Sequence, residues 1–570
     1  MTAREVEGRT LGARTAARTV PVQDFLLSSG GSPCGPSHPS AKPAHGSSVS
    51  LLDRMESSSA NSGPDLRATI HIGASSVSML IREPASGDEP GNQVEFLEKP
   101  LPLARDIFRR GRISRSTTEH AVEILFGFGE SLREVGVDLD QVERAVATNI
   151  LAEAENVEVF LNRLNIACGL HLEVLDDGEM TRLIYLKTRR RLKDTPSMKT
   201  CNTLVVHVGP GNTRILLFRK GRINRYTSYR LGAHRTGEAV EASHADGAAL
   251  LRLIREQISG QISQIYYDFE HDDVEDIIVI GYELQLLTPY LTKGHNAKTT
   301  LKSLQEFVSE IAEITGEERV QRYQLDYHTA DAVVPALETN LAIAEIFNLQ
   351  SLRIPDSDYE RGILGDLPRS PALATGFQAE VIRSARILAQ KFKVDAKHAG
   401  HVAKLVSRLF EETAELHQLT EHDALLLEVA AILHECGGYV SPRAHHKHSQ
   451  YLIQNSEIFG LSRPDVLTVS LIARYHRRSG PKTRHADYRS LPGPERIRVS
   501  KMAAIMRVAD ALERAHSQRV RDFSVEITRN KIRLNLIGVT NAAVERLAMQ
   551  SKGDLFHDVF GLEVVLSEQG

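Results

Sequence analysis

The stretches HIGASSVSMLI (71–81) and HVGPGNTRILLF (207–218) decide the fold of this chain. Each reads as a short apolar strand that ends at a glycine and turns at once into a second strand. Glycine lets the backbone approach a ligand closely, and a tight turn of this kind directs several backbone N–H groups into a concavity that suits phosphate. The two stretches begin about 135 residues apart. The sequence therefore predicts two related halves, each opening on a phosphate-binding hairpin.

The segments around the two hairpins continue the alternation of strands and helices. In the first half, apolar alternation predicts strands at 68–73, 76–83, 142–149 and 171–177, and helical spacing predicts helices at 117–136 and 153–167. In the second half, the same criteria predict strands at 203–209, 213–218, 222–231 and 276–281 and a helix at 247–265. This order favours an α/β fold.

The chain changes character on both sides of this α/β region. Residues 1–65 are rich in Ser, Gly and Pro and cannot bury enough apolar surface to offset their chain entropy, so we expect a disordered tail. After about residue 370 helices replace strands, most clearly at 398–416, 422–437 and 498–516, and strands return at 523–538 and 562–566. We expect a first lobe at 66–195, a second lobe at 196–360, a helical domain at 370–520 and a small α/β C-terminal cap at 521–570.

Composition indicates an ordinary globular protein. The 570 residues are 41% apolar and 25% charged, and 69 basic against 73 acidic residues give a net charge of −4. No basic excess points to a specific nucleic-acid partner, and no stretch has the roughly 18 to 20 apolar residues that a membrane helix needs. The cysteines, Cys34, Cys168, Cys201 and Cys436, form no CxxC pair, which is consistent with a reducing compartment, so we expect a cytoplasmic protein.

Several motifs resemble the exopolyphosphatase / guanosine pentaphosphate phosphatase (Ppx/GppA) family. HIGASSVSM (71–79) is similar to the family's DIGSNSVRL, and HVGPGNTRI (207–215) to its DIGGGSTEL. Further matches are DGEMTRLIY (177–185) to GxEEARLIY, LGAHRTGE (231–238) to LGAxRLxE, and AAILHECGGYVSPRAHHKHSQYLI (430–453) and ARYHRR (473–478) to the family's helical region. The resemblance spans about residues 66 to 570.

The resemblance implies both an architecture and an activity. The fold would be a two-lobed core like that of actin and the sugar kinases (ribonuclease-H-like), followed by an all-α HD-like domain and a small α/β cap. The activity would be hydrolysis of a terminal phosphoanhydride of polyphosphate or guanosine pentaphosphate in the interlobe cleft, with Mg or Mn as cofactor. Family members are commonly homodimers, so the resemblance also implies a homodimer.

Four acidic positions of the family are replaced in this chain. The aspartates that open the two loops correspond to His71 and His207, the catalytic glutamate to Met180, and the glutamate that closes the second loop to Arg214. The phosphate-binding residues that the resemblance then implies are Gly73, Ser75, Ser76, Gly209, Gly211, Asn212, Thr213, Arg214, His71 and His207. Metal-assisted hydrolysis needs carboxylates to hold the ion and a base to orient water.

These replacements leave three interpretations of the cleft. Glycine amides, hydroxyls, Arg and His can bind a polyanion without a metal, which gives a phosphate-chain binder or sensor that no longer hydrolyses. Alternatively, the loops keep only the fold. In the third interpretation Glu179, next to the missing base, is the catalytic residue and joins Asp176, Asp177 and the two loop histidines in a transition-metal site.

The helical region contains a second candidate site. Its order of histidines and acids resembles metal phosphohydrolases of the HD class, with candidate metal ligands His398, His434, Glu435, His446 (or His448), His476 and Asp510. Glu435 stands where that class has Asp, and the added methylene moves the carboxylate by about 1.5 Å. The region is therefore either a structural scaffold or a transition-metal site of an HD-type nucleotide phosphohydrolase. The run RAHHKH (443–448) with Arg474, Arg477, Arg478 and Lys482 would also suit a long polyanion.

Overall fold

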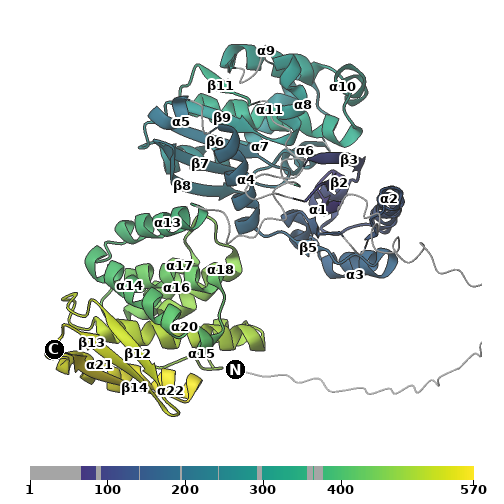
Figure 1. Cartoon of the computed structure of the whole chain (residues 1–570). Coiled ribbons are helices and arrows are strands. Elements are labelled where there is room, and N and C mark those ends of the chain that lie inside the picture. Colours follow the sequence, from purple (N-terminus) through teal and green to yellow (C-terminus); the bar gives the residue numbers. More distant parts are fainter. Residues whose placement is uncertain are drawn as a thin grey trace, which may run out of the picture. The chain divides into compact units, whose positions relative to one another are not determined.

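The computed structural model describes residues 66–84, 92–139, 142–192, 196–241, 243–291, 298–355, 364 and 376–569 (Figure 1). The described residues belong to one unit of the chain by their contacts. The tail predicted at 1–65 lies outside the described residues, and so does most of the predicted boundary near 360–370.

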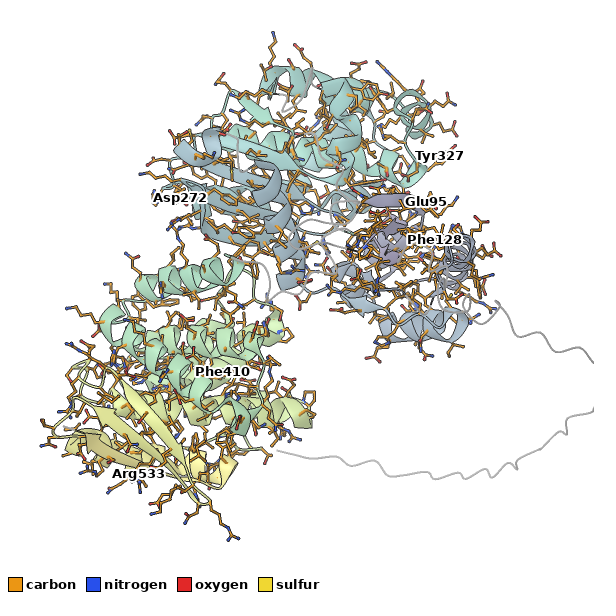
Figure 2. All side chains as sticks on the ribbon, viewed as in Figure 1. Glu95, Phe128, Asp272, Tyr327, Phe410 and Arg533 are labelled. Carbon is orange, nitrogen blue, oxygen red and sulfur yellow. The ribbon has the colours of Figure 1, made fainter. Side chains whose placement is uncertain are left out.

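The first sheet runs in the order β3-β2-β1-β4-β5. β1 (Arg67–Ile72), β2 (Ser76–Arg82) and β3 (Gln93–Pro100) are antiparallel neighbours, and β4 (Arg144–Ala147) and β5 (Glu173–Val174) continue the sheet parallel to β1. The helices of this part are α1 (Leu103–Arg110), α2 (Arg115–Glu134), the short 3₁₀ helix η2 (Asn149–Glu153), α3 (Val157–Cys168) and α4 (Asp177–Leu192). Side chains such as Ile70 and Phe128 form its core, and Figure 2 labels Phe128, which is 2% exposed.

The second sheet opens with the same arrangement. β6 (Asn202–Val208), β7 (Thr213–Arg219) and β8 (Arg222–Tyr229) are antiparallel, and β9 (Asp276–Ile280) pairs parallel with β6. The sheet order is β10-β11-β9-β6-β7-β8, with β10 (Lys298–Thr300) and β11 (Ser351–Arg353) at one edge. The remaining elements are α5 (Pro196–Thr200), α6 (Ala233–Glu241), α7 (Gly247–Phe269), α8 (Tyr282–Leu291), α9 (Leu301–Glu313), α10 (Gly316–Tyr323) and α11 (Tyr327–Ile346). The mixed α/β class that the sequence predicts is confirmed.

The described residues 376–522 form no strand. They contain α13 (Phe377–Lys391), α14 (Ala396–Glu412), α15 (Ala414–His417), α16 (Glu421–Leu433), the 3₁₀ helix η4 (Cys436–Tyr439), α17 (His445–Gln454), α18 (Arg463–Tyr475), α19 (Ala486–Ser490) and α20 (Gly493–Leu512). Capping boxes start two of these helices: Thr420 with Asp423 starts α16, and Ser462 with Asp465 starts α18. The helices share one core with the last sheet.

The last sheet is connected to α20 by two helices. Its strands β12 (Phe523–Ile527), β13 (Lys531–Ile537) and β14 (Glu563–Gln569) are joined by α21 (Ala543–Lys552) and α22 (Asp554–Phe560), and both helices contact α20. The buried Arg507 guanidinium on α20 fixes the junction of α21 and α22, because it donates to the backbone carbonyls of Ser551 and Lys552. It also forms an ion pair of 2.6 Å with Asp554.

Several predicted elements differ from the observed ones. The strand predicted at 171–177 is only two residues long, because Asp176 caps the start of α4 by accepting from Glu179 N at 2.8 Å. The helix predicted at 422–437 ends at Leu433, so His434 is its C-terminal cap. The cysteines within the described ranges, Cys168, Cys201 and Cys436, are free. Among the helices that the structure describes, none has the length and apolar character to cross a bilayer.

Candidate functional site

Each of the two hairpins is closed by a hydrogen bond from its first glycine. Gly73 N donates to Ser76 O at 2.7 Å, and Gly209 N donates to Asn212 O at 3.0 Å. An added Cβ would lie 3.0 Å from Ser76 O at Gly73 and 3.1 Å from Asn212 O at Gly209. These positions need glycine because the turn leaves no room for a side chain, and neither has a left-handed backbone.

Both hairpins line one cavity of about 50 Å³. The lining residues are His71, Gly73, Ala74, Ser75 and Ser76 from the first hairpin, His207, Val208, Gly209, Pro210 and Arg214 from the second, and Thr148, Asn149, Met180, His234, Tyr282 and Glu283 from neighbouring elements. Since a cavity of about 10 to 15 Å³ is enough to hold one water molecule, this cavity has room for one small group.

Gly211, Asn212 and Thr213, three of the predicted phosphate-binding residues, are not among the residues that line this cavity. The Thr213 hydroxyl is buried and donates to the Leu231 carbonyl at 2.6 Å. A Cβ at Gly211 would lie 2.8 Å from the ring of Phe108, so this glycine allows close packing on α1. Asn212 lines a separate cavity. These three residues of the motif therefore contribute to the packing of the loop and not to the lining of this cavity.

The first hairpin leaves two backbone N–H groups at the cavity. The carbonyls of Ala74 and Ser75 accept from Ala104 N and Leu101 N, but within the described residues the amides of Ala74 and Ser75 have no acceptor. The Ser76 hydroxyl is engaged, since it donates to Glu98 at 2.7 Å. Unpaired amides beside a cavity are the groups that an anion would use.

Arg214 does not add a net positive charge to the cavity. Its buried guanidinium forms an ion pair of 2.6 Å with Asp177, at the start of α4, and Asp177 also accepts from Asn149 at 2.9 Å. The positive charge of the arginine that replaces the family's glutamate is therefore compensated by a carboxylate. These contacts connect β7 with α4 and the start of η2.

Glu179 lies outside the cavity that Met180 lines. It is in a separate cavity of about 270 Å³, where its carboxylate binds Arg182 at 2.6 Å and Arg144 at 3.1 Å. Burial raises the pKa of Glu179, but the hydrogen bonds and charges of these two arginines outweigh it, and the net shift is downward. A paired carboxylate with a lowered pKa is a poor general base, so the geometry gives no support to the predicted catalytic role.

The cavity also contains a pair of buried residues that the sequence did not reveal. His234 Nε2 on α6 lies 3.6 Å from Glu283 Oε1 on α8, and both side chains are less than one tenth exposed. Burial lowers the pKa of His234 to about 4. The histidine lies in the LGAHRTGE motif, but its partner on α8 carried no sequence signal.

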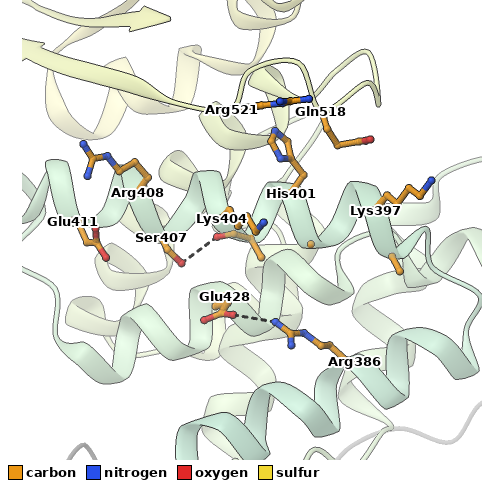
Figure 3. A pocket seen from close by; sticks show the side chains of 13 residues that line it. Arg386, Lys397, His401, Lys404, Ser407, Arg408, Glu411, Glu428, Gln518 and Arg521 are labelled. Atoms are coloured by element: carbon orange, nitrogen blue, oxygen red, sulfur yellow. Dashed lines mark hydrogen bonds and ion pairs between the residues drawn. The ribbon is translucent and has the colours of Figure 1, made fainter. Parts of the chain in front are cut away.

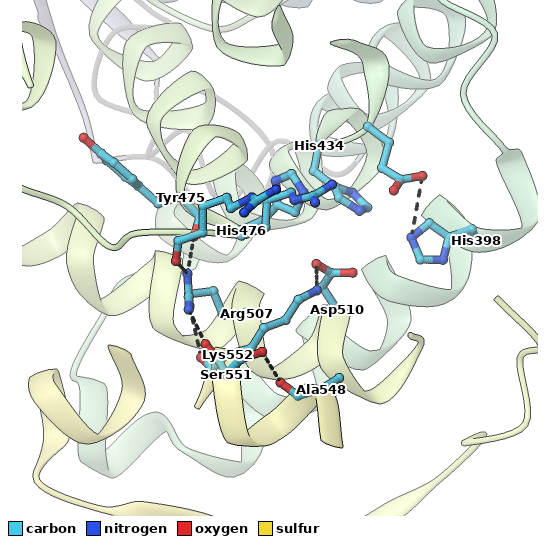
Figure 4. Close-up of polar contacts among 12 residues, drawn as sticks. His398, His434, Tyr475, His476, Arg507, Asp510, Ala548, Ser551 and Lys552 are labelled. Carbon is cyan, nitrogen blue, oxygen red and sulfur yellow. Dashed lines mark hydrogen bonds and ion pairs between the residues drawn. The ribbon is translucent and has the colours of Figure 1, made fainter. Parts of the chain in front are cut away.

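The helical region brings three of its six predicted ligands together. His398, His434 and Glu435 each offer a ligand atom, and these atoms all lie within 4.8 Å of one another. His398 Nε2 and Glu435 Oε2 are 3.9 Å apart, and the centroids of the two imidazole rings are 5.3 Å apart (Figure 4). Both histidines are completely buried, whereas Glu435 is 28% exposed.

The orientation of these imidazoles suits a cation. His434 Nδ1 is 2.8 Å from the Ala431 carbonyl, so this nitrogen carries the proton and Nε2 presents a lone pair. In the described chain, His434 Nε2 and both ring nitrogens of His398 are buried without a hydrogen-bond partner. Burial and the neighbouring His434 lower the pKa of His398 to about 4, so it is neutral at pH 7, as a metal ligand must be.

Asp510 is held by a lysine instead. The ammonium of Lys552, at the end of α21, forms an ion pair with the Asp510 carboxylate, as Figure 4 shows. Both side chains are about one tenth exposed or less. Burial opposes ionisation of Asp510, but Lys552 and the nearby imidazoles shift its pKa downward. The Lys552 ammonium thus lies beside the Asp510 carboxylate, which the sequence predicted to bind a metal ion.

The predicted ligands His446 and His476 are also outside the three-residue group. His476 Nδ1 contacts the Ala473 carbonyl, and its Nε2 is 3.2 Å from Nε2 of His445. The histidine of α17 that contacts His476 is therefore His445, one position before the predicted His446. His446 lies beside Arg477, and burial lowers its pKa to about 4.

Two family models match this chain. The model of the Ppx/GppA phosphatase family matches residues 98–369, and the model of Ppx/GppA phosphatase domain III matches residues 382–550. The chain belongs to the Ppx/GppA phosphatase family. The hairpin at 71–81 precedes the matched ranges, so its assignment rests on the motif and on the cavity that it shares with the second hairpin.

Relatives of this Ppx/GppA chain include guanosine-5'-triphosphate,3'-diphosphate pyrophosphatases. The protein of Aeromonas salmonicida (strain A449) is 24% identical over 418 residues, which cover 70% of this chain and 78% of the relative. That of Aliivibrio fischeri (strain MJ11) is 22% identical and covers 78% and 87%.

Similar solved structures include an exopolyphosphatase from Cytophaga hutchinsonii ATCC 33406 and a Ppx/GppA family member from Aquifex aeolicus. The first is 16% identical with a TM-score of 0.45, and the second is 22% identical with a TM-score of 0.41. Each covers 53% of this chain and 97% of its own.

Ppx/GppA phosphatases generally depend on a divalent metal, but the cleft of this chain does not fit Mg. Mg requires oxygen ligands in near-octahedral geometry. Glu283 supplies the one carboxylate among the residues that line the cavity, and it is beside His234. The transition-metal interpretation of the cleft gains no support either, because in the described ranges the one group of ligating atoms close enough for an ion is that of His398, His434 and Glu435.

Proposed function

We propose that this Ppx/GppA chain recognises the terminal phosphate of polyphosphate or guanosine pentaphosphate in the interlobe cleft and does not hydrolyse it there. The proposal rests on the residues that line the cavity. His71, His207 and Met180 lie there in place of the two aspartates and the glutamate of the family. The names of the relatives suggest the two ligand classes.

The chemistry of hydrolysis explains why these residues matter. Cleavage of a phosphoanhydride needs a cation that neutralises developing charge and a group that orients the attacking water. A thioether at Met180 cannot accept a proton from water. The absence of a positioned base alone lowers the rate by about 10² to 10⁴.

Binding requires less than hydrolysis. The free amides of Ala74 and Ser75 offer two donors to a phosphate oxygen, and His71 and His207 line the same cavity. The volume of about 50 Å³ suits a single terminal group. The rest of a phosphate chain or nucleotide would extend outside the cavity.

A charge placed in the cavity tests this proposal. Ser75→Glu puts a carboxylate where the phosphate would lie, and we expect it to abolish calorimetric binding of tripolyphosphate and guanosine pentaphosphate. Ser309→Glu adds the same charge on an exposed face of α9 and should bind like the wild type. Unchanged binding by Ser75→Glu would refute a phosphate site in the cleft.

A second function is favoured by the group of His398, His434 and Glu435. Two neutral imidazoles and a carboxylate suit Zn, Mn or Fe, and the partial exposure of Glu435 leaves a side on which water or substrate can enter. We propose a metal-dependent phosphohydrolase of the HD type acting on a nucleotide as this second candidate. His434→Ala should then abolish phosphate release, whereas His71→Ala should leave it intact.

We also propose the domain boundaries given above, a cytoplasmic location and a homodimer. The family resemblance supports a homodimer, and the absence of a CxxC pair supports a reducing compartment. Light scattering coupled to size-exclusion chromatography separates a chain of 63.2 kDa from its dimer.

A further inference from the structure

A cavity at the junction of α4 with the helical region belongs to neither of the proposed sites. It has a volume of about 270 Å³ and is lined from β4, β5, the start of α4, α13, α16 and the start of α18. None of its lining residues lines the cleft cavity or belongs to the group of His398, His434 and Glu435. The proposed functions therefore leave this junction cavity unexplained.

The elements around the junction cavity are tightly packed. The centroid of the Tyr185 ring on α4 lies 5.9 Å from that of Phe377 and 5.4 Å from that of Phe459. A Cβ at Gly178 would lie 2.6 Å from the Ser462 backbone nitrogen, so the start of α4 directly contacts the start of α18. The cavity is therefore enclosed by a close-packed contact between these elements.

One wall contains a buried guanidinium with an unused donor. Arg182 is 1% exposed, and its Nε and Nη2 donate to the Glu179 carboxylate at 2.6 and 2.7 Å. Arg182 lines the cavity, and its Nη1 is buried without a hydrogen-bond partner among the described residues. A buried charged donor without an acceptor is costly, and a charged acceptor binds about twice as strongly as a neutral one. This wall thus favours a ligand with a carboxylate group.

Another wall of the cavity is acidic. Of the four carboxylates that line it, those of Glu173, Glu179 and Asp465 each have an arginine or histidine partner. Asp176 has no cationic partner in the described chain and accepts from Glu179 N. Burial raises the pKa of Asp176, and the like charges of Asp465 and Glu179 add to this shift, although backbone N–H groups of α4 oppose it. An ammonium group beside Asp176 would compensate its charge.

The remaining wall is apolar. Phe377 is 4% exposed and Leu425 is 9% exposed, and both line the cavity. A Cβ at Gly460 would overlap the Phe377 ring, so this glycine allows the chain to pack closely on the ring. Drug-sized ligands occupy pockets of roughly 300 to 1,000 Å³, so the junction cavity suits a smaller molecule.

The charges of the junction cavity disfavour a polyanion. Two arginines face four carboxylates here, whereas five Lys and Arg side chains and two carboxylates line a groove of about 870 Å³ along α14 (Figure 3). A phosphate group would bring further negative charge next to the carboxylates, and like charges repel each other at short distance. A small ligand with one group of each charge fits both the basic and the acidic wall.

We propose that the junction cavity binds a free α-amino acid with an apolar side chain. Its carboxylate accepts from Arg182 Nη1, its ammonium pairs with Asp176, and its side chain contacts the apolar wall. A simple amine would leave Arg182 Nη1 without an acceptor, and a simple carboxylate would leave Asp176 without a cation. The inference goes beyond the proposed function of the cleft, because the two cavities share no residue.

A ligand series tests this proposal on the full-length chain. L-Valine, L-leucine, L-methionine and L-phenylalanine are titrated by calorimetry, and we expect at least one of them to bind. The amino acid that binds most tightly is then compared with the amine that lacks its carboxylate and with the acid that lacks its ammonium; for L-leucine these are isoamylamine and 4-methylpentanoate. Each analogue loses a charged hydrogen bond and should bind at least about tenfold more weakly.

Two variants and a matched control locate the site. Asp176→Asn removes the carboxylate charge but keeps an oxygen that can cap α4, and Arg182→Lys keeps a charge beside Glu179 but removes Nη1. Each should weaken amino-acid binding at least about tenfold. Asp558→Asn removes an exposed carboxylate of α22 outside the cavity and should bind like the wild type. If Arg182→Lys does not fold, Asp176→Asn still decides the outcome.

Three results would overturn the proposal. They are the absence of binding by all four amino acids, equal binding by Asp176→Asn and the wild type, and binding of guanosine or orthophosphate that Arg182→Lys weakens. In the last case the occupant would be a nucleoside or an inorganic anion. The Ser75→Glu variant of the cleft should bind the amino acid like the wild type, so failure of the cleft site and failure of the junction cavity are distinguishable.

Discussion

Replacement of His434 by Gln should remove the metal affinity of the helical region. His434 is completely buried, and it offers one of three ligand atoms that lie within 4.8 Å of one another. Gln has a similar volume but cannot present an imidazole lone pair. The variant should therefore fold and lose a ligand, and its thermal unfolding should no longer respond to Zn or Mn.

The magnitude follows from binding linkage. A metal present at 100 times its dissociation constant stabilises the folded state by about 2.7 kcal/mol. A supporting group outside the metal's own ligands is worth about 10- to 100-fold in affinity, so loss of a direct ligand should cost at least about 100-fold. The same metal concentration then equals the dissociation constant and stabilises by about 0.4 kcal/mol. The metal-induced stabilisation should thus fall by about 2.3 kcal/mol.

The assay compares urea unfolding with and without metal for each variant, so that any effect of the substitution on the fold cancels. His446→Gln is the matched control, because this histidine lies outside the group of three. It should retain the full metal-induced stabilisation. Equal responses of His434→Gln and wild type, or equal losses in the two variants, would refute the assignment of the site.

Three further results are expected. Lys552→Met leaves the buried Asp510 carboxylate without its ion-pair partner and should lower the free energy of unfolding by about 3 to 5 kcal/mol, measured by urea denaturation. Burial and a neighbouring carboxylate raise the pKa of Glu238 from an ordinary 4.5 to about 7, so between these pH values the folded state binds a proton that the unfolded state does not. The free energy of unfolding should therefore fall as pH rises through this window. The Glu238→Gln variant should show a weaker dependence of this free energy on pH. Gly211→Ala places a Cβ 2.8 Å from the Phe108 ring and should cost about 1 to 3 kcal/mol.

Each of these results has an outcome that contradicts it. The Lys552→Met loss should be largely recovered when Asp510 is also changed to Leu, and a double variant as unstable as the single one would show that the ion pair is not the cause. A Glu238→Gln protein with the wild-type pH profile would assign the titration to another group. A Gly211→Ala protein as stable as the wild type would mean that the loop relaxes freely.

The hairpins and their glycines were predictable because strong local signals specify them. At least half of the positions in each of β1, β2, β6 and β7 are apolar, and each strand adjoins a glycine or a tight turn. β3 escaped prediction because its residues are partly exposed and mix charged with apolar side chains. The three-residue strands β10 and β11 are too short to carry a period, and their pairing depends on contacts distant in sequence.

The candidate sites were predictable only in part. Sequence order identifies the histidines, but a shift of one position rotates a side chain by about 100° around a helix, so the choice between His445 and His446 needs the structure. Likewise, the partners of Arg214 and Asp510 come from other elements of the chain. Asp177 and Lys552 carry no sequence signal for these roles, since ion pairs distant in sequence depend on the packing of whole elements.

The central claim is that the cleft binds phosphate chains without hydrolysing them. The most direct measurement is orthophosphate release from guanosine pentaphosphate and polyphosphate in the presence of Mg or Mn, made on the His434→Ala variant so that the helical region cannot contribute. Calorimetric binding is followed on the same sample. The account predicts binding with no release of orthophosphate. Metal-dependent release by this variant would contradict it, because the cleft would then be catalysing the reaction with Met180 in place of the glutamate.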